Sequence, residues 1–120
     1  MKVTVYQYPK CGTSRKALKW LRAHDVAFTS INLVETPPTR AQLAAFLERS
    51  GLKPKALFNT SGASYRAGGF KSKLPAMSVD EMLDALAADG KLIKRPIVDI
   101  EGGTVLVGFK EQLYEEAFGK

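Results

Sequence analysis

Cysteine is almost absent from this chain of 120 residues, in which Cys11 is the only one. A single cysteine cannot form an intramolecular disulfide, so no disulfide can stabilise the fold. The chain shows no secretion signal, and no apolar run approaches the roughly 18 residues of a membrane span. We therefore expect a protein of the reducing cytoplasm that has no membrane segment.

Histidine is equally scarce, because His24 is the only one. No second metal ligand of suitable spacing lies near it, and a cationic side chain at a helix C-terminus accounts for it better than a metal site does. We expect no metal site and no bound cofactor.

Acidic residues are few in the first part of the chain. Residues 1–75 contain 13 Lys and Arg but only 3 Asp and Glu, whereas residues 76–120 contain 5 and 9. A basic region around the cysteine suits an anionic substrate or cosubstrate, although charge alone also fits an ordinary solvated surface. No helix-turn-helix, zinc or RNP-like pattern is present, so we predict no direct binding of nucleic acid.

The strongest local feature is the stretch 8–16, YPKCGTSRK, between a predicted strand at 3–6 and a predicted helix at 13–24. Cys11 would stand at the start of that helix, where backbone N–H groups and the helix dipole favour an anion. Lys10, Arg15 and Lys16 add positive charge. Each of these influences lowers a thiol pKa, and the thiolate is the nucleophile. The alternative is a small buried hydrophobic residue, which is the common role of a lone cysteine.

The remaining pattern predicts one α/β domain over residues 1–120. A strand at 28–33 would lie parallel to the first one. Capping boxes at Thr39–Gln42 and Ser78–Glu81 open two helices, the second spanning 79–89 and closed by Gly90. Short helical turns are expected at 54–58 and 64–67. The helical stripes should bury Leu43, Phe46, Leu47, Val79, Met82, Leu83 and Leu86.

The C-terminal part predicts a β-hairpin and a helix. A strand begins at Pro96, which belongs at its first residue, turns at 101–104 and returns antiparallel over 104–107. A last helix at 110–118 should bury Leu113, Tyr114 and Ala117. The order is β-α-β, a helical insert at about 36–90, and β-β-α.

This order, with a cysteine at the first strand–helix junction and a proline before the third strand, resembles the thioredoxin-like fold. The resemblance implies three layers, a mixed four-stranded sheet and a cis Pro96. Three segments, PKCGTSR at 9–15, ETPPTR at 35–40 and RPIV at 95–98, resemble the glutaredoxin-dependent arsenate reductase (ArsC) family. Its relatives include the Spx-type transcription regulators.

The resemblance implies a thiol-dependent oxidoreductase, and hence an enzyme. Cys11 would attack arsenate or a mixed disulfide, and glutathione or a glutaredoxin would resolve the adduct. Arg95, with its planar fork of donors, would bind the oxyanion, assisted by Gly12, Thr13, Ser14 and Arg15 in the loop. Glutathione would be a cosubstrate.

The sequence departs from the arsenate reductases at three positions. By the resemblance, Gln7 stands where they have a histidine, and Asn59 and Gly108 stand where they have arginines. Lys10, Arg66 and Lys110 are the candidates to supply replacement charge. The alternative function is an Spx-like regulator that binds the RNA polymerase α subunit. Those regulators commonly carry a Cys-x-x-Cys redox switch. Here Ser14 stands where they have the second cysteine, so this loop cannot form a disulfide.

Overall fold

The computed structural model describes residues 2–119. The contacts between residues divide the chain into two compact units. We call residues 1–32 with 95–120 the sheet unit and residues 33–94 the helical unit. Among the described residues, no helix is both long and apolar enough to cross a membrane.

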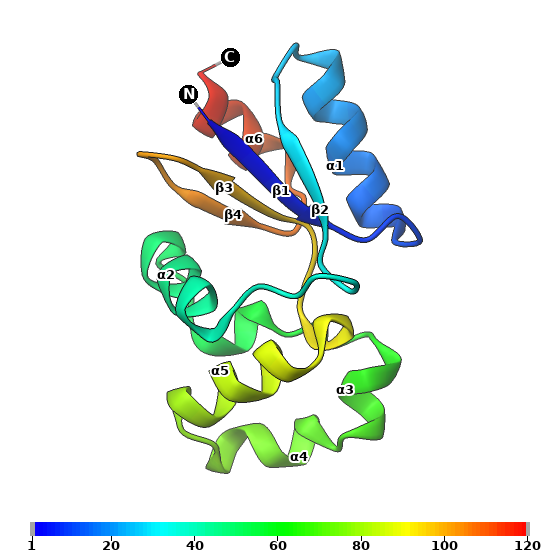
Figure 1. The fold of residues 1–120 in the computed structure, drawn as a ribbon, viewed down its shortest axis with the longest axis vertical. Helices are drawn as coiled ribbons and strands as arrows, with labels where there is room; N and C mark the ends of the chain where they lie inside the picture. The colour runs from blue at the N-terminus through cyan, green and yellow to red at the C-terminus, as the bar shows by residue number, and fades with distance from the viewer. Residues whose placement is uncertain (1, 120) are drawn as a thin grey trace. The chain divides into compact units, whose positions relative to one another are not determined.

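The sheet unit contains four strands and two helices (Figure 1). In chain order these are β1 (Val3–Gln7), α1 (Gly12–Ala23), β2 (Thr29–Asn32), β3 (Ile97–Ile100), β4 (Val105–Val107) and α6 (Glu111–Phe118). The strand order is β2-β1-β3-β4, with β1 and β2 parallel and both other pairs antiparallel. The mixed four-stranded sheet of an α/β fold is thereby confirmed.

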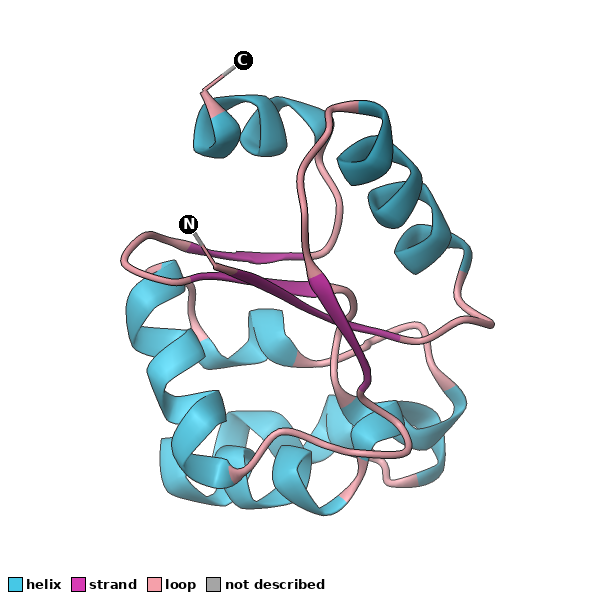
Figure 2. Ribbon diagram, turned by 45° about the horizontal axis from the view of Figure 1, so that its top comes forward, coloured by secondary structure: helices cyan, strands magenta, loops and turns pink. Residues whose placement is uncertain are grey.

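Both helices of this unit cover one face of the sheet (Figure 2). Val3 and Val5 of β1 pack with Val98 and Ile100 of β3, which are their neighbours in an antiparallel register. Because side chains alternate between the two faces of a strand, these residues lie on the same face of the sheet. The two helices cover that face with a set of buried side chains: Ala17, Trp20, Leu21 and Tyr114. This core holds the start of α1 at the end of β1.

The helical unit is a run of short helices. They are α2 (Arg40–Ser50), the 3₁₀ turn η1 (Pro54–Leu57), α3 (Ala63–Ala67), α4 (Phe70–Lys73), the 3₁₀ turn η2 (Leu74–Ala76), α5 (Val79–Ala88) and the 3₁₀ turn η3 (Gly90–Leu92). Both predicted capping boxes are present, at Thr39–Gln42 and at Ser78–Glu81. The turns expected near 54–58 and 64–67 are confirmed, whereas α4 and η2 were not predicted.

Five side chains that were expected to be buried are not fully buried. Val79 is 46% exposed and Leu113 is 44% exposed, because each lies in the first turn of its helix on the side away from the core. Leu47, Met82 and Ala117 are only half-buried. Strand β2 is shorter than 28–33, and its Thr29 and Ser30 are exposed, as befits an edge strand.

Gly90 has a different role from the predicted helix cap. The C-cap of α5 is Asp89, and Gly90 opens η3 with an ordinary backbone conformation. A Cβ atom at Gly90 would collide with the carbonyl oxygen of Leu33. Glycine is therefore required here because the two backbone segments approach each other closely.

Candidate active site

The loop between β1 and α1 presents Cys11 at the N-terminus of the helix. Cys11 is the N-cap residue of α1, with an extended backbone, and its N–H donates to the carbonyl of Tyr8 at 2.9 Å. This bond closes the turn that contains Pro9 and Lys10. The thiol is half-buried, so it remains accessible to a reactant.

Ser14 supports the cysteine from inside the helix. It is 0% exposed, and its hydroxyl accepts a hydrogen bond from the backbone N–H of Tyr8 at 3.2 Å. Its own O–H and backbone N–H act on the Cys11 sulfur as donors that lower the pKa of the thiol. The third position after the cysteine thus carries a buried donor that also fixes the loop.

Arg95 approaches the same sulfur from the segment before β3. Its guanidinium acts on the Cys11 thiol as a donor that lowers the thiol pKa, and it lies over the ring of Tyr8, 5.1 Å from the ring centroid. The Arg95–Pro96 peptide bond is cis, as predicted. Tyr8 was not predicted as part of the site. The available signal was an aromatic residue directly before the loop proline.

The electrostatics of the site favour a thiolate. Partial burial raises the pKa of the Cys11 thiol, but donors from Ser14, Arg95 and the backbone N–H of Thr13 outweigh it and lower the pKa below its ordinary value. Backbone N–H groups at a helix N-terminus and a guanidinium also bind oxyanions. The same donors therefore suit a thiolate or an anionic reactant beside it.

The side chains of the other predicted loop residues are not among the groups that lower the pKa of Cys11. Arg15 donates from Nη1 to the carbonyl of Pro9 at 3.0 Å, so it braces the turn. Lys10 and Thr13 have exposed side chains. A Cβ at Gly12 would meet only the Arg15 guanidinium, at 3.9 Å, so the fold does not require glycine there.

Three more predicted positions have different surroundings. Lys110 is the exposed N-cap of α6 and is not among the groups that lower the Cys11 pKa. Asn59 belongs to the helical unit, where its backbone bonds Leu92 and its side chain lies against Gly62. Gly108 has a φ of +81°, and its N–H donates to the carbonyl of Pro96 at 2.8 Å.

Gln7, at the end of β1, is also buried. Its Nε2 donates to the Ser30 hydroxyl at 2.9 Å, which ties β1 to the edge strand. Within the part of the chain that the structure describes, no cluster of three or more His, Cys, Asp or Glu residues could hold a metal ion.

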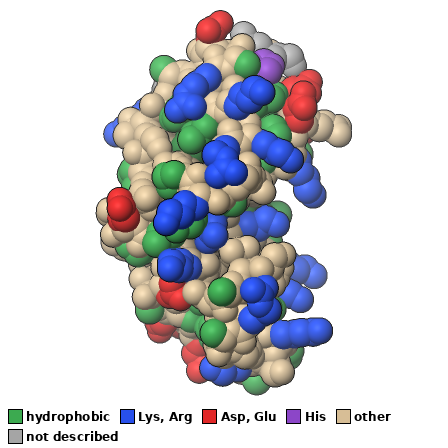
Figure 3. All heavy atoms as spheres, turned by 90° about the vertical axis from the view of Figure 1, so that its right-hand side faces the viewer, with side chains coloured by type: hydrophobic (Ala, Val, Ile, Leu, Met, Phe, Trp, Pro, Cys, Tyr) green, Lys and Arg blue, Asp and Glu red, His purple; other side chains and the backbone are tan. Residues whose placement is uncertain are grey.

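A basic helix extends from the cysteine. Helix α1 carries Arg15, Lys16, Lys19 and Arg22 at exposed positions and contains no acidic residue. Figure 3 shows Lys and Arg side chains over the face that carries this helix. Their field attracts anionic reactants toward the loop.

Comparison with known proteins identifies relatives over nearly the whole chain. The model of the ArsC family matches residues 6–117. The uncharacterized protein YusI of Bacillus subtilis is 52% identical over 97% of this chain and 98% of its own length. An arsenate reductase of Rhizobium meliloti is 35% identical over 88% of this chain and 74% of its own.

Regulators and solved structures also occur among the similar proteins. The regulatory protein MgsR of Bacillus subtilis is 28% identical over 87% of this chain and 82% of its own. The crystal structure of an ArsC family related protein from Bacteroides fragilis has a TM-score of 0.94 at 44% identity, covering 98% of both chains. With its thioredoxin-like sheet and cysteine loop, the chain therefore belongs to the ArsC family.

Proposed function

We propose that this protein is a thiol-dependent oxidoreductase in which the Cys11 thiolate is the nucleophile. The observation that carries the proposal is the convergence of Arg95, Ser14 and the first turn of α1 on one half-exposed sulfur. Because the thiolate is the attacking species, donors that lower the thiol pKa increase the reactive fraction at neutral pH.

The proposed electrophile is an arsenate-like oxyanion or a mixed disulfide. With arsenate, the Cys11 sulfur displaces one oxygen, which leaves as water after protonation. A glutathione thiolate then attacks the Cys11 sulfur, and the electron pair of the S–As bond stays on arsenic, which is thereby reduced from As(V) to As(III). The disulfide that remains between Cys11 and glutathione passes its glutathione to a glutaredoxin thiol, which restores Cys11.

With a mixed disulfide, Cys11 attacks one sulfur and the other leaves as a thiolate. Arg95 and the loop donors would orient the carboxylates of a glutathione moiety as readily as arsenate. This second reaction needs fewer cations. The two arginines of the arsenate reductases that are absent at Asn59 and Gly108 each correspond to about 1.5–3 kcal/mol of oxyanion binding. The positive φ at position 108 also disfavours an arginine there.

A single-turnover assay tests both reactions. The protein is mixed with glutathione and glutaredoxin, and either arsenate or a glutathionylated peptide is added. We expect release of arsenite or of the reduced peptide, with a glutathione adduct on Cys11 detected by mass spectrometry. Cys11→Ser should abolish both product and adduct. Absence of any product and of any Cys11 adduct in the unmodified protein would refute the proposal.

The similarity to MgsR favours a second candidate, a regulator that contacts the RNA polymerase α subunit. Its test is capture of purified α subunit by this protein and by the Cys11→Ser variant. Equal capture by both, without turnover in the assay above, would favour the regulator over the enzyme. Failure of both proteins to capture the subunit would exclude it.

A further inference from the structure

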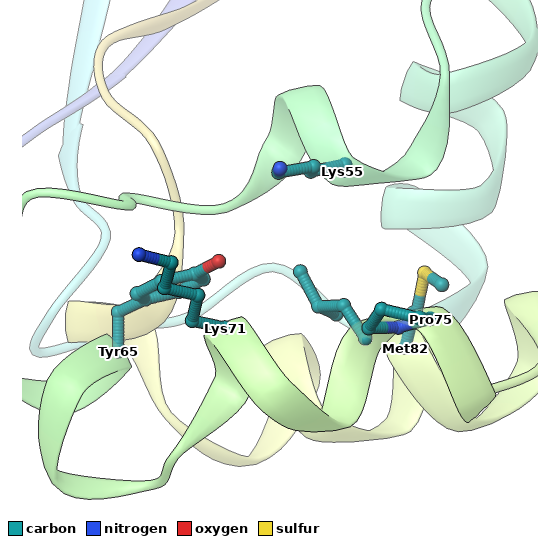
Figure 4. A pocket seen from close by; sticks show the side chains of 6 residues that line it. Lys55, Tyr65, Lys71, Pro75 and Met82 are labelled. Atoms are coloured by element: carbon teal, nitrogen blue, oxygen red, sulfur yellow. The ribbon is translucent and has the colours of Figure 1, made fainter.

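A cavity of about 190 Å³ lies within the helical unit, remote in sequence from the cysteine loop. Its walls come from η1, α3, α4, η2 and α5 (Figure 4). The lining side chains are Lys55, Tyr65, Lys71, Leu74, Pro75 and Met82. The two lysines and the tyrosine end in polar groups, whereas the other three side chains are apolar.

Tyr65 is the polar group that is fixed in place. Its side chain is 6% exposed, and its ring packs against Phe58 and Phe70 at centroid distances of 6.4 Å and 6.1 Å. Figure 4 shows its hydroxyl oxygen directed into the open space of the cavity. No hydrogen bond of this hydroxyl occurs within residues 2–119. The ring is buried, but the hydroxyl is not one of the buried side-chain atoms that lack a partner, so it is accessible from the cavity and can donate to a ligand.

Lys55 and Lys71 give the cavity a positive charge. Neither forms an ion pair within the described residues. The sequence contains six basic residues and no acidic one between Glu48 and Asp80. The two ammonium groups are therefore not neutralised locally along this stretch.

The acidic residues of the neighbouring helix α5 already have partners. Arg40 binds Asp80 at 2.6 Å and Asp84 at 2.7 Å. Glu81 accepts the backbone N–H of Ser78 at 2.8 Å in the capping box. None of these carboxylates lines the cavity, so none competes with an anionic ligand for the two lysines, whose side chains are exposed.

We propose that this cavity binds a small carboxylate that carries one apolar group. The carboxylate accepts hydrogen bonds from Tyr65, Lys55 and Lys71, and the apolar group packs on Leu74, Pro75 and Met82. The volume limits the apolar group to about one aromatic ring or a branched alkyl chain, since a cavity of roughly 150 Å³ accommodates benzene. This assignment is independent of the chemistry at Cys11.

The test is a titration of the full chain with 3-phenylpropionate, followed by ¹H–¹⁵N correlation spectra. We expect saturable shifts at the lining residues, with a dissociation constant on the order of 1 mM, as ligands of this size commonly give. The neutral alcohol 3-phenylpropanol and inorganic phosphate each lack half of the required chemistry, so both should bind at least about fivefold more weakly.

Variants locate the site. Tyr65→Phe removes only the hydroxyl and should weaken binding by about two- to tenfold. Lys55→Ala and Lys71→Ala should each weaken it by up to about fivefold, since their ammonium groups are partly solvated. Lys53→Ala is the matched control, because Lys53 is exposed two positions from Lys55 but does not line the cavity. It should bind as the unmodified protein does.

Three results would overturn the inference. They are an absence of saturable shifts up to about 20 mM ligand, far above the expected constant, equal binding of acid and alcohol, and equal weakening by Lys53→Ala and Lys55→Ala. Cys11→Ser should bind the carboxylate normally, so failure here and failure of the oxidoreductase proposal are separate outcomes.

Discussion

The backbone N–H of Tyr8 donates to the hydroxyl of Ser14, 3.2 Å away. This bond joins the last residue before the loop to the first turn of α1. It occupies the oxygen of Ser14 as an acceptor and leaves the serine O–H available to the sulfur of Cys11. One buried hydroxyl therefore both fixes the loop and stabilises the thiolate.

Replacing this serine should reduce the reactivity of the cysteine. Ser14→Ala removes the hydroxyl donor and should raise the pKa of Cys11, although the backbone N–H at position 14 remains. A hydrogen bond to a charged group is worth up to about 1.5–3 kcal/mol, and less at a half-exposed sulfur. We expect alkylation at pH 7 to slow several-fold, measured with iodoacetamide over a pH series.

Thr13→Ala is the matched control for that experiment. Thr13 acts on the sulfur through its backbone N–H, which alanine retains, and its side chain is exposed. The pKa of Cys11 should stay unchanged in this variant. An equal rise in both variants would show that the serine hydroxyl has no specific effect.

Arg95 should determine both the cysteine pKa and the affinity for oxyanions. Arg95→Ala should raise the pKa of Cys11 and abolish protection of the thiol against alkylation by sulfate or phosphate. Arg95→Lys should also be impaired, because a lysine offers a point charge instead of a planar fork. The exposed neighbour Lys94 provides the control variant Lys94→Ala. Undiminished protection by sulfate in Arg95→Ala would contradict this role.

The lowered pKa of Cys11 also predicts a pH dependence of stability. In the unfolded chain the thiol titrates near its ordinary pKa of about 8.5, so between the folded and unfolded pKa values the unfolded state binds more protons. The free energy of unfolding should therefore rise with pH across this window. The stabilisation should be fully present above the unfolded pKa and lost as the pH falls through the folded one.

Denaturant titrations of the unmodified protein and of Cys11→Ser measure this effect. The difference between their free energies of unfolding should grow with pH by roughly a few tenths of a kcal/mol. The effect is small because the sulfur is partly solvated. A difference that is constant from neutral pH to about pH 9, the upper end of the expected window, would mean that the thiol pKa is not lowered by folding.

Gly90→Ala should destabilise the helical unit. The added Cβ would collide with the Leu33 carbonyl, which is backbone and cannot rotate away. Overpacking of this kind costs about 1–3 kcal/mol. Thermal unfolding of this variant should be compared with that of Gly12→Ala, where the nearest atom is 3.9 Å from the new Cβ and no loss is expected. Equal stability of the two variants would contradict the close approach.

Local signals in the sequence determined the order of the strands and of the longer helices, both capping boxes, the parallel β1–β2 pair, the hairpin and the place of Cys11 at the start of α1. These features depend on residues close together in the chain, such as Thr39 with Gln42 or Ser78 with Glu81. The periodicity of apolar residues and the capping residues therefore suffice to predict these features.

Only the tertiary structure decided which side chains meet. The stacking of Arg95 over Tyr8, the exposure of Val79 and Leu113, and the contact that requires glycine at position 90 each depend on segments distant in sequence. The helical periodicity of a sequence shows which residues share a face of the helix, but not which face packs against another element. For the same reason, the placement of the unpartnered Tyr65 hydroxyl beside two lysines is visible only in three dimensions.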